Sequence, residues 1–203
     1  MRPHTKSEKL NAFIHLLGVV FVVIFGPVLW FQETSGLIQK VGIAVYLLSF
    51  AGVFGSSAMY HFHSGHYWKA KLKLADQIWI YLFIAGTNTV YITSFANHIK
   101  GYIILAILYS LALLGIFWKT SAFSDKEWLF LLYYLLLGWF GGFTIYLIYD
   151  QLNDIALALL IAGGLFYTIG AYFYRHDYRR WFHAIWHTMV LFGAIAHFCA
   201  LLV

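Results

Sequence analysis

Ten histidines occur in a chain with only eight carboxylates, and imidazole is both a common metal ligand and a base near neutral pH. His183 and His187 are four residues apart, which places both rings on one face of a helix. Two imidazoles at this spacing can bind one metal ion. No Glu follows His183, so the segment lacks the general base of the usual metalloprotease motif. Two interpretations are open: His183 and His187 contribute two ligands to a metal site, or they form a hydrogen-bonding pair at a membrane interface.

A second set of candidate residues lies near the middle of the chain. Ser57 and His61 are again four residues apart, and Asp76 opens the next apolar run. Three histidines from two helices, with an Asp and a Ser nearby, match the composition of an open catalytic zinc site. In such a site zinc lowers the pKa of a bound water to about 7. The alternatives are that Ser57 is a small helix-packing residue and that Asp76 lies in a loop outside the lipid.

The composition indicates which elements must position these residues. The 203 residues are 62% hydrophobic and 10% charged, whereas soluble domains are roughly 45–50% apolar and roughly 25% charged. A single Cys excludes a disulfide framework. The net charge of +5 comes from short loops between apolar runs, which favours membrane orientation over nucleic-acid binding. We therefore expect one integral membrane domain over residues 1–203.

Spanning helices need roughly 20 apolar residues each, and this chain has room for seven. None of the apolar runs shows the alternation of a membrane barrel, so the sequence predicts an all-α seven-transmembrane helix bundle. The predicted spans are residues 12–31, 41–62, 74–95, 101–118, 128–149, 155–174 and 181–203.

Basic residues set the expected orientation. All but Lys40 and Lys100 of the 13 Lys and Arg residues fall before the first span or in alternate loops. The positive-inside rule then predicts a cytoplasmic N-terminus and an extracytoplasmic C-terminus. In this topology the end of the second span and the starts of the third and seventh share the cytoplasmic face. His61, Asp76 and His183 can therefore meet in one layer.

The first span contributes further polar residues. Glu8, Asn11 and His15 share a helical face through steps of three and four residues. They form either an ordinary capped helix start or a polar strip that closes the cytoplasmic mouth of the bundle. His197 lies roughly 15 Å deeper than His187 along the last span, and we expect it to form hydrogen bonds within the bundle.

These motifs resemble those of a known family, the hemolysin III branch of the progestin and adipoQ receptor (PAQR) family. The resemblance is carried by Glu8-x2-Asn11-x3-His15, Ser57-x3-His61 with Asp76, and His183-x3-His187. The wider superfamily includes adiponectin receptors and alkaline ceramidases. The resemblance implies that His61, His183 and His187 hold zinc, with Asp76 and Ser57 beside the bound water.

The family pattern is not matched at every position. Gln77 and Asn88 stand where we would expect a His and an aromatic residue. Neither is a proposed ligand, but both can alter the lining of the pocket.

The first functional hypothesis is a ceramidase-like zinc hydrolase that cleaves an amide or ester bond of a membrane lipid. Asp76 would accept the proton of the water, and Ser57 would hold the water or the oxyanion. The alternatives are a non-enzymatic membrane sensor with a structural zinc and, third, a pore or transporter. By resemblance, the expected location is the bacterial cytoplasmic membrane and the expected role is membrane homeostasis.

Overall fold

The computed structural model describes residues 6–121 and 127–203, apart from the side chains of Lys6, Ser7 and His66. All regular secondary structure within the described residues is helical. In chain order the elements are α1 (Lys6–Gln32), α2 (Leu37–Phe62), α3 (His66–Phe95), α4 (Ile99–Thr120), α5 (Glu127–Phe140), α6 (Gly142–Ile148), the 3-10 helix η1 (Tyr149–Gln151), α7 (Asp154–Arg175) and α8 (Phe182–Ala200).

Seven segments of the described chain are long and apolar enough to cross a membrane, which confirms the predicted all-α seven-span architecture. The boundaries differ most at α3, which begins at His66 rather than near residue 74. Its first turns carry three lysines, whose long side chains suit a helix that continues beyond the hydrocarbon core. Asp76 therefore lies in the third turn of α3 and not at its start.

The fifth span is broken into α5 and α6 at Gly141, which the hydropathy pattern does not reveal. The Gly141 N–H donates to Gly138 O at 3.0 Å, and Thr144 in α6 donates to Asn88 Oδ1 of α3 at 2.7 Å. A Cβ at Gly141 would lie 2.9 Å from Gly138 O and 3.0 Å from Asn88 Oδ1. Glycine thus permits the close approach of this break to α3.

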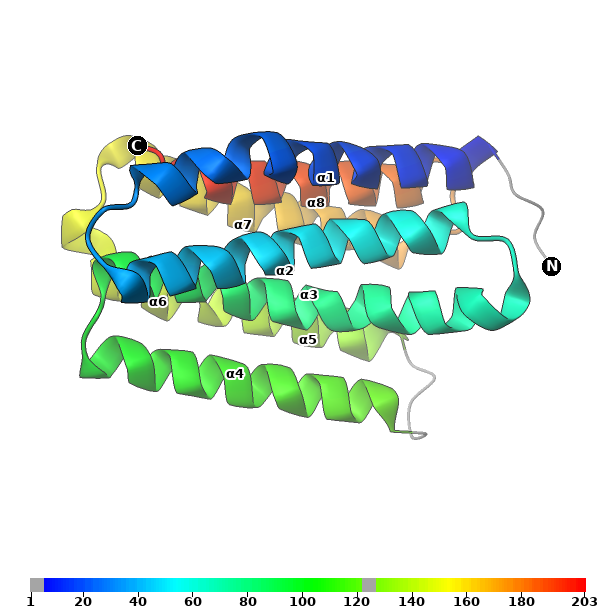
Figure 1. The fold of residues 1–203 in the computed structure, drawn as a ribbon. Helices are drawn as coiled ribbons and strands as arrows, with labels where there is room; N and C mark the ends of the chain where they lie inside the picture. The colour runs from blue at the N-terminus through cyan, green and yellow to red at the C-terminus, as the bar shows by residue number, and fades with distance from the viewer. Residues whose placement is uncertain (1–5, 122–126) are drawn as a thin grey trace.

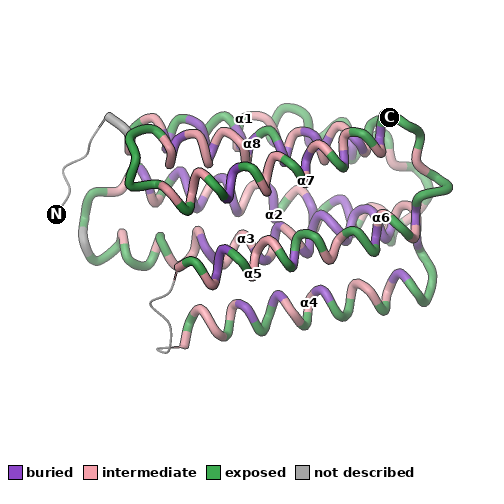
Figure 2. Tube along the Cα trace, turned by 180° about the vertical axis from the view of Figure 1, so that it is seen from behind, coloured by how far each residue is buried: buried purple, intermediate pink, exposed green. Residues whose placement is uncertain are grey.

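The helices lie side by side with alternating direction, as Figure 1 shows. Packing contacts run from α1 through α2, α3, α4, α5, α7 and α8, and α8 packs back against α1. The spans therefore form a closed ring. Helix α3 also contacts α5 and α6, and its span is the most buried of the seven. Helix α4 lies at the outer edge and has few buried residues (Figure 2).

Aromatic side chains fill the interior from the level of the histidines toward the other end of the bundle. The cluster consists of Tyr46, Phe50 and Phe54 from α2, Phe83 from α3 and Phe198 from α8, all buried. The distances between the centroids of neighbouring rings range from 4.9 Å, for Phe50 and Phe54, to 6.5 Å, for Phe54 and Phe83. Packing of this kind excludes water from the centre of the bundle.

Candidate metal centre

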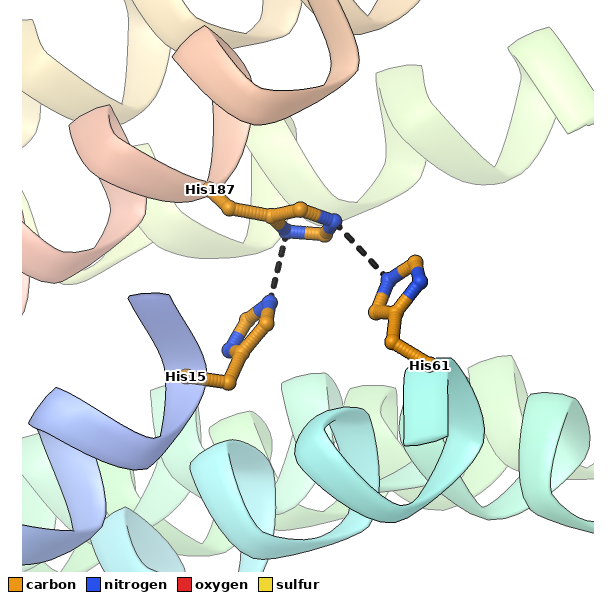
Figure 3. A group of neighbouring side chains, drawn as sticks. All are labelled: His15, His61 and His187. Atoms are coloured by element: carbon orange, nitrogen blue, oxygen red, sulfur yellow. Dashed lines mark hydrogen bonds between the residues drawn. The ribbon is translucent and has the colours of Figure 1, made fainter. Parts of the chain in front are cut away.

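Three buried histidines from three helices converge at one end of the bundle. His15 lies in the third turn of α1, His61 in the last turn of α2 and His187 in the second turn of α8 (Figure 3). One ring nitrogen from each lies within 4.8 Å of the others, and the residues are 3%, 2% and 5% exposed. Imidazoles grouped in this way can bind a metal ion.

The direction of the helices brings these three residues together. Helices α1 and α8 run in the same sense and α2 runs in the opposite one, so two starts and one end meet at the same level (Figure 1). Helix α8 begins directly after Trp181, whose left-handed φ of 72° turns the chain into the helix. Phe54, one turn further from the end of α2 than Ser57, packs 5.5 Å from the His15 ring and covers the cluster on its inner side.

Hydrogen bonds link the three rings into a chain. His15 Nε2 lies 2.7 Å from His187 Nδ1, and His187 Nε2 lies 3.0 Å from His61 Nε2. His61 Nδ1 is 3.2 Å from Glu8 Oε2, which also accepts a hydrogen bond from Lys69 Nζ at 2.9 Å. An ionised carboxylate only accepts, so Nδ1 of His61 carries the proton. The lone pair of His61 Nε2 therefore faces His187.

His183 borders the same cluster. Its ring centroid lies 4.5 Å from that of His187 and 5.5 Å from that of His61. His183 Nδ1 is 3.4 Å from Asp177 Oδ2, and the side chain is partly exposed. The structure thus brings the three histidines singled out in the sequence into one group. His15 makes a fourth ring.

The sequence left His15 open between an ordinary capped helix start and a polar strip at the mouth of the bundle. In the structure its ring faces His187, and its Nδ1 has no hydrogen-bond partner among the described residues. Asn11, one turn before His15, is also buried. The spacing of Glu8, Asn11 and His15 on one face, together with the shared direction of the first and last spans, contains the signal for this placement.

Asp76 and Ser57 lie on the α3 and α2 sides of the histidines. Ser57 is buried one turn before His61. Asp76 is half-buried beside Ser57, and Lys73 and His183 contribute to its electrostatic environment. The Ser57 hydroxyl lies beside the Asp76 carboxylate. It forms no well-aligned hydrogen bond with any of the described residues.

Gln77 and Asn88, the two departures from the family pattern, lie outside the histidine group. Gln77 Nε2 donates to Glu127 Oε2 at 3.0 Å, at the junction of α3 and α5. Asn88 accepts from Thr144 at the break between α5 and α6. Both residues therefore join α3 to the fifth span.

Fold and site together define a multi-pass membrane protein with a buried cluster of three histidines able to bind a metal ion. The sequence model of the family described as "Haemolysin-III related" matches residues 4–198, and the chain belongs to this family.

Named relatives agree with this assignment. The hemolysin-3 homolog of Bacillus subtilis (strain 168) is 31% identical, over 97% of this chain and 93% of the relative. Hemolysin-3 of Bacillus cereus is 32% identical, over 99% and 93%. The human monocyte to macrophage differentiation factor, a PAQR-family protein, is 24% identical, over 98% and 85%. The resemblance stated from the motifs is thereby confirmed.

Proposed function

We propose that this protein is a zinc-dependent hydrolase that cleaves an amide or ester bond of a membrane lipid and serves membrane homeostasis in the bacterial cytoplasmic membrane. The observation that carries the proposal is the convergence of buried imidazoles next to a half-buried carboxylate, Asp76. Metal-assisted hydrolysis needs this combination, namely ligands for the metal and a proton acceptor beside them.

We assign the metal to Nε2 of His61, His183 and His187. Each of these rings has a partner at Nδ1, namely Glu8, Asp177 and His15 respectively. A partner at Nδ1 fixes the ring and directs the Nε2 lone pair to a metal, which is the usual outer arrangement of histidine ligands. His15 is then a positioning residue for His187. The alternative ligand set is His15, His61 and His187, in which His15 replaces His183.

The donor set suits zinc, which prefers nitrogen and sulfur ligands. Nε2 of His61 and Nε2 of His187 are 3.0 Å apart, and two lone pairs facing each other at that distance would repel. A proton on His187 Nε2 relieves the repulsion, and so would a bound cation. If the His187 proton were on Nδ1 and donated to His15 Nε2, with the His15 proton on its own Nδ1, then Nε2 of His187 would be free to hold a metal without a change in net charge.

The reaction follows from the residues around this point. A bound zinc ion supplies Lewis-acid activation of water and of the acyl carbonyl. A carboxylate oxygen of Asp76 accepts a proton from the attacking water, whose oxygen bonds to the acyl carbon. The bond from that carbon to nitrogen or oxygen breaks, and Asp76 returns the proton to the leaving amine or alcohol. Ser57 orients the water or the developing oxyanion through its hydroxyl.

The test compares Asp76→Asn with the wild type in zinc content and in the lipid profile of a deletion strain complemented with each. The amide keeps the shape but loses the basic carboxylate, so zinc content should persist while turnover falls by roughly 10²–10⁴-fold. Asp150→Asn, an exposed carboxylate at the opposite end, serves as the control. Identical lipid profiles for wild type and Asp76→Asn, or loss of zinc in Asp76→Asn, contradict the proposal.

A second candidate is a non-enzymatic membrane sensor with a structural metal. The observation in its favour is the fourth imidazole, because closed structural zinc sites have four protein ligands. In that case His15 and His183 would both be needed for metal binding, and no lipid product would depend on Asp76.

A further inference from the structure

An apolar groove lies along the seam between α1 and α8. Its volume is about 450 Å³, within the range of roughly 300–1,000 Å³ typical of small-ligand sites. The wall from α1 includes Phe13 and Leu17, and the other wall includes Trp181, Ile185 and Phe192. Phe13, Leu17, Trp181 and Phe192 are 54%, 43%, 45% and 46% exposed. All of these side chains except Trp181, which directly precedes α8, belong to two membrane-spanning helices, so an apolar chain of the bilayer is the chemically matched occupant.

One end of the groove is basic. Lys9 is exposed and lies one turn before Phe13 on the same face of α1. Arg180 directly precedes Trp181, and its guanidinium carbon is 4.8 Å from the centroid of the Trp181 ring. Helices α1 and α8 run in the same direction (Figure 1), and Lys9 and Arg180 each lie at the start of one of them, so both cations lie at the same end of the groove. The end that meets the membrane surface is thus complementary to an anionic headgroup.

A second groove on the same molecule provides an internal comparison. It lies between α1 and α2 toward the other end, has a volume of about 400 Å³ and is lined by residues that include Val23, Trp30 and Leu47. Lys40 stacks on Trp30 at 5.7 Å, while the carboxylate of Glu33 follows α1 at this end. This groove has the apolar walls but one charge of each sign, so it lacks the paired cations of the first.

We propose that the α1–α8 groove binds one anionic glycerophospholipid of the surrounding bilayer. An acyl chain lies against Phe13, Leu17, Ile185 and Phe192, and the phosphate is held by Lys9 and Arg180. The groove is on the outer side of the seam that the His15–His187 hydrogen bond crosses on the inner side. The bound lipid therefore braces the two helices that carry these histidines. The site does not depend on hydrolysis of any lipid.

The test titrates the purified full-length protein in detergent with phosphatidylglycerol and, separately, with phosphatidylcholine of the same chains, and counts bound lipids by native mass spectrometry. We expect one tight phosphatidylglycerol adduct and weaker binding of phosphatidylcholine. Lys9→Ala with Arg180→Ala should weaken phosphatidylglycerol binding by about fivefold for each charge removed and weaken phosphatidylcholine binding less, because the choline offsets the charge of its phosphate. Lys71→Ala removes an exposed cation of α3 at the same end of the bundle as Lys9 and Arg180. It should have no effect on the binding of either lipid.

Filling the groove with a larger side chain tests the acyl-chain contact separately from the phosphate contact. Thr188 lines the groove, and Thr188→Trp should remove the tight adduct, whereas Val23→Trp in the second groove should retain it. A thermal unfolding curve in detergent verifies that each variant is folded, and the charge variants test the site without altering the groove. Equal affinity of the wild type for both lipids overturns the proposal, as does unchanged phosphatidylglycerol selectivity after loss of Lys9 and Arg180.

Discussion

At the scale of single residues, the arrangement of ring nitrogens explains why several polar side chains are buried together. Glu8 anchors Nδ1 of His61 and is itself neutralised by Lys69, so a carboxylate is tolerated at a half-buried position. His15 occupies Nδ1 of His187 in the same way. These partners restrict the rotation of the rings, and restricted rings lose less entropy when a metal binds.

Replacing Glu8 by Gln tests its role as a positioning residue. The amide accepts a weaker hydrogen bond from His61 Nδ1 and no longer pairs with Lys69, so zinc affinity should fall by roughly 10–100-fold. Competition with a chelator measures that affinity. Glu127→Gln is the matched control, because Glu127 pairs with Lys73 and Lys119 between α3, α4 and α5 without contacting a histidine of the cluster. Equal affinities of Glu8→Gln and wild type would refute the role.

The two possible ligand sets differ only in His15 and His183. If His183 is a ligand and His15 only positions His187, His183→Ala should abolish stoichiometric zinc binding. His15→Ala should then weaken zinc binding by roughly 10–100-fold. His98→Ala, at an exposed position that precedes α4, should leave zinc content unchanged. The opposite order of effects for His15 and His183 would assign the ligand role to His15.

At the scale of the elements, small residues set how closely neighbouring helices approach. Gly163 of α7 faces His197 of α8, whose Nε2 lies 3.2 Å from Leu160 O of α7. This confirms the expected hydrogen bonding of His197 within the bundle. The adjacent Gly164 faces open space apart from Trp139. Two consecutive glycines therefore differ in function, and only the first belongs to the α7–α8 contact.

Alanine substitutions at these two glycines should separate packing from helix propensity. A Cβ at Gly163 would overlap the His197 ring and lie 3.2 Å from Gly193 O, so Gly163→Ala should lower the free energy of unfolding by about 1–3 kcal/mol. At Gly164 the nearest contact is 3.9 Å away, and the change should stay within about 1 kcal/mol. Unfolding in mixed micelles measures both. A loss at Gly164 as large as that at Gly163 would contradict the packing argument.

At the scale of the whole molecule, charge is concentrated at the end that carries the histidines. Lysines and arginines from the starts of α1 and α3, the end of α4 and the connection from α7 to α8 gather there, whereas Lys40 and Lys100 lie at the other end. Arg2 and Lys126, which also entered the orientation argument, fall outside the described residues. This asymmetry is the basis of the predicted orientation, with the histidine end on the cytoplasmic side.

Reporter fusions check this orientation. A reporter inserted at Ser64, in the short connection between α2 and α3, should read as cytoplasmic, and one fused after Val203 as extracytoplasmic. Ser64 lies outside both helices, so an insertion there interrupts neither of them. Reversed readings at the two sites would place the histidine cluster and the basic end of the α1–α8 groove on the opposite side of the membrane.

The sequence by itself determined the seven spans and singled out two of the three histidines of the buried cluster, His61 and His187. In lipid each spanning segment forms its own backbone hydrogen bonds, so the local hydropathy of the sequence is enough to predict each span. The spacing of Ser57 with His61 and of His183 with His187 is equally local, because helical geometry alone puts each pair on one face. Alternation of span direction then placed these pairs at one level.

Only the tertiary structure decided which helices are neighbours and how each is rotated about its axis. It closed the ring between α1 and α8, which brought His15 against His187, and it set the break at Gly141 beside Asn88. It also extended α3 back to His66, which moved Asp76 into the third turn. Hydropathy does not encode these features, because lipid and neighbouring helices are similarly apolar and the choice between them depends on the fit of side chains far apart in the sequence.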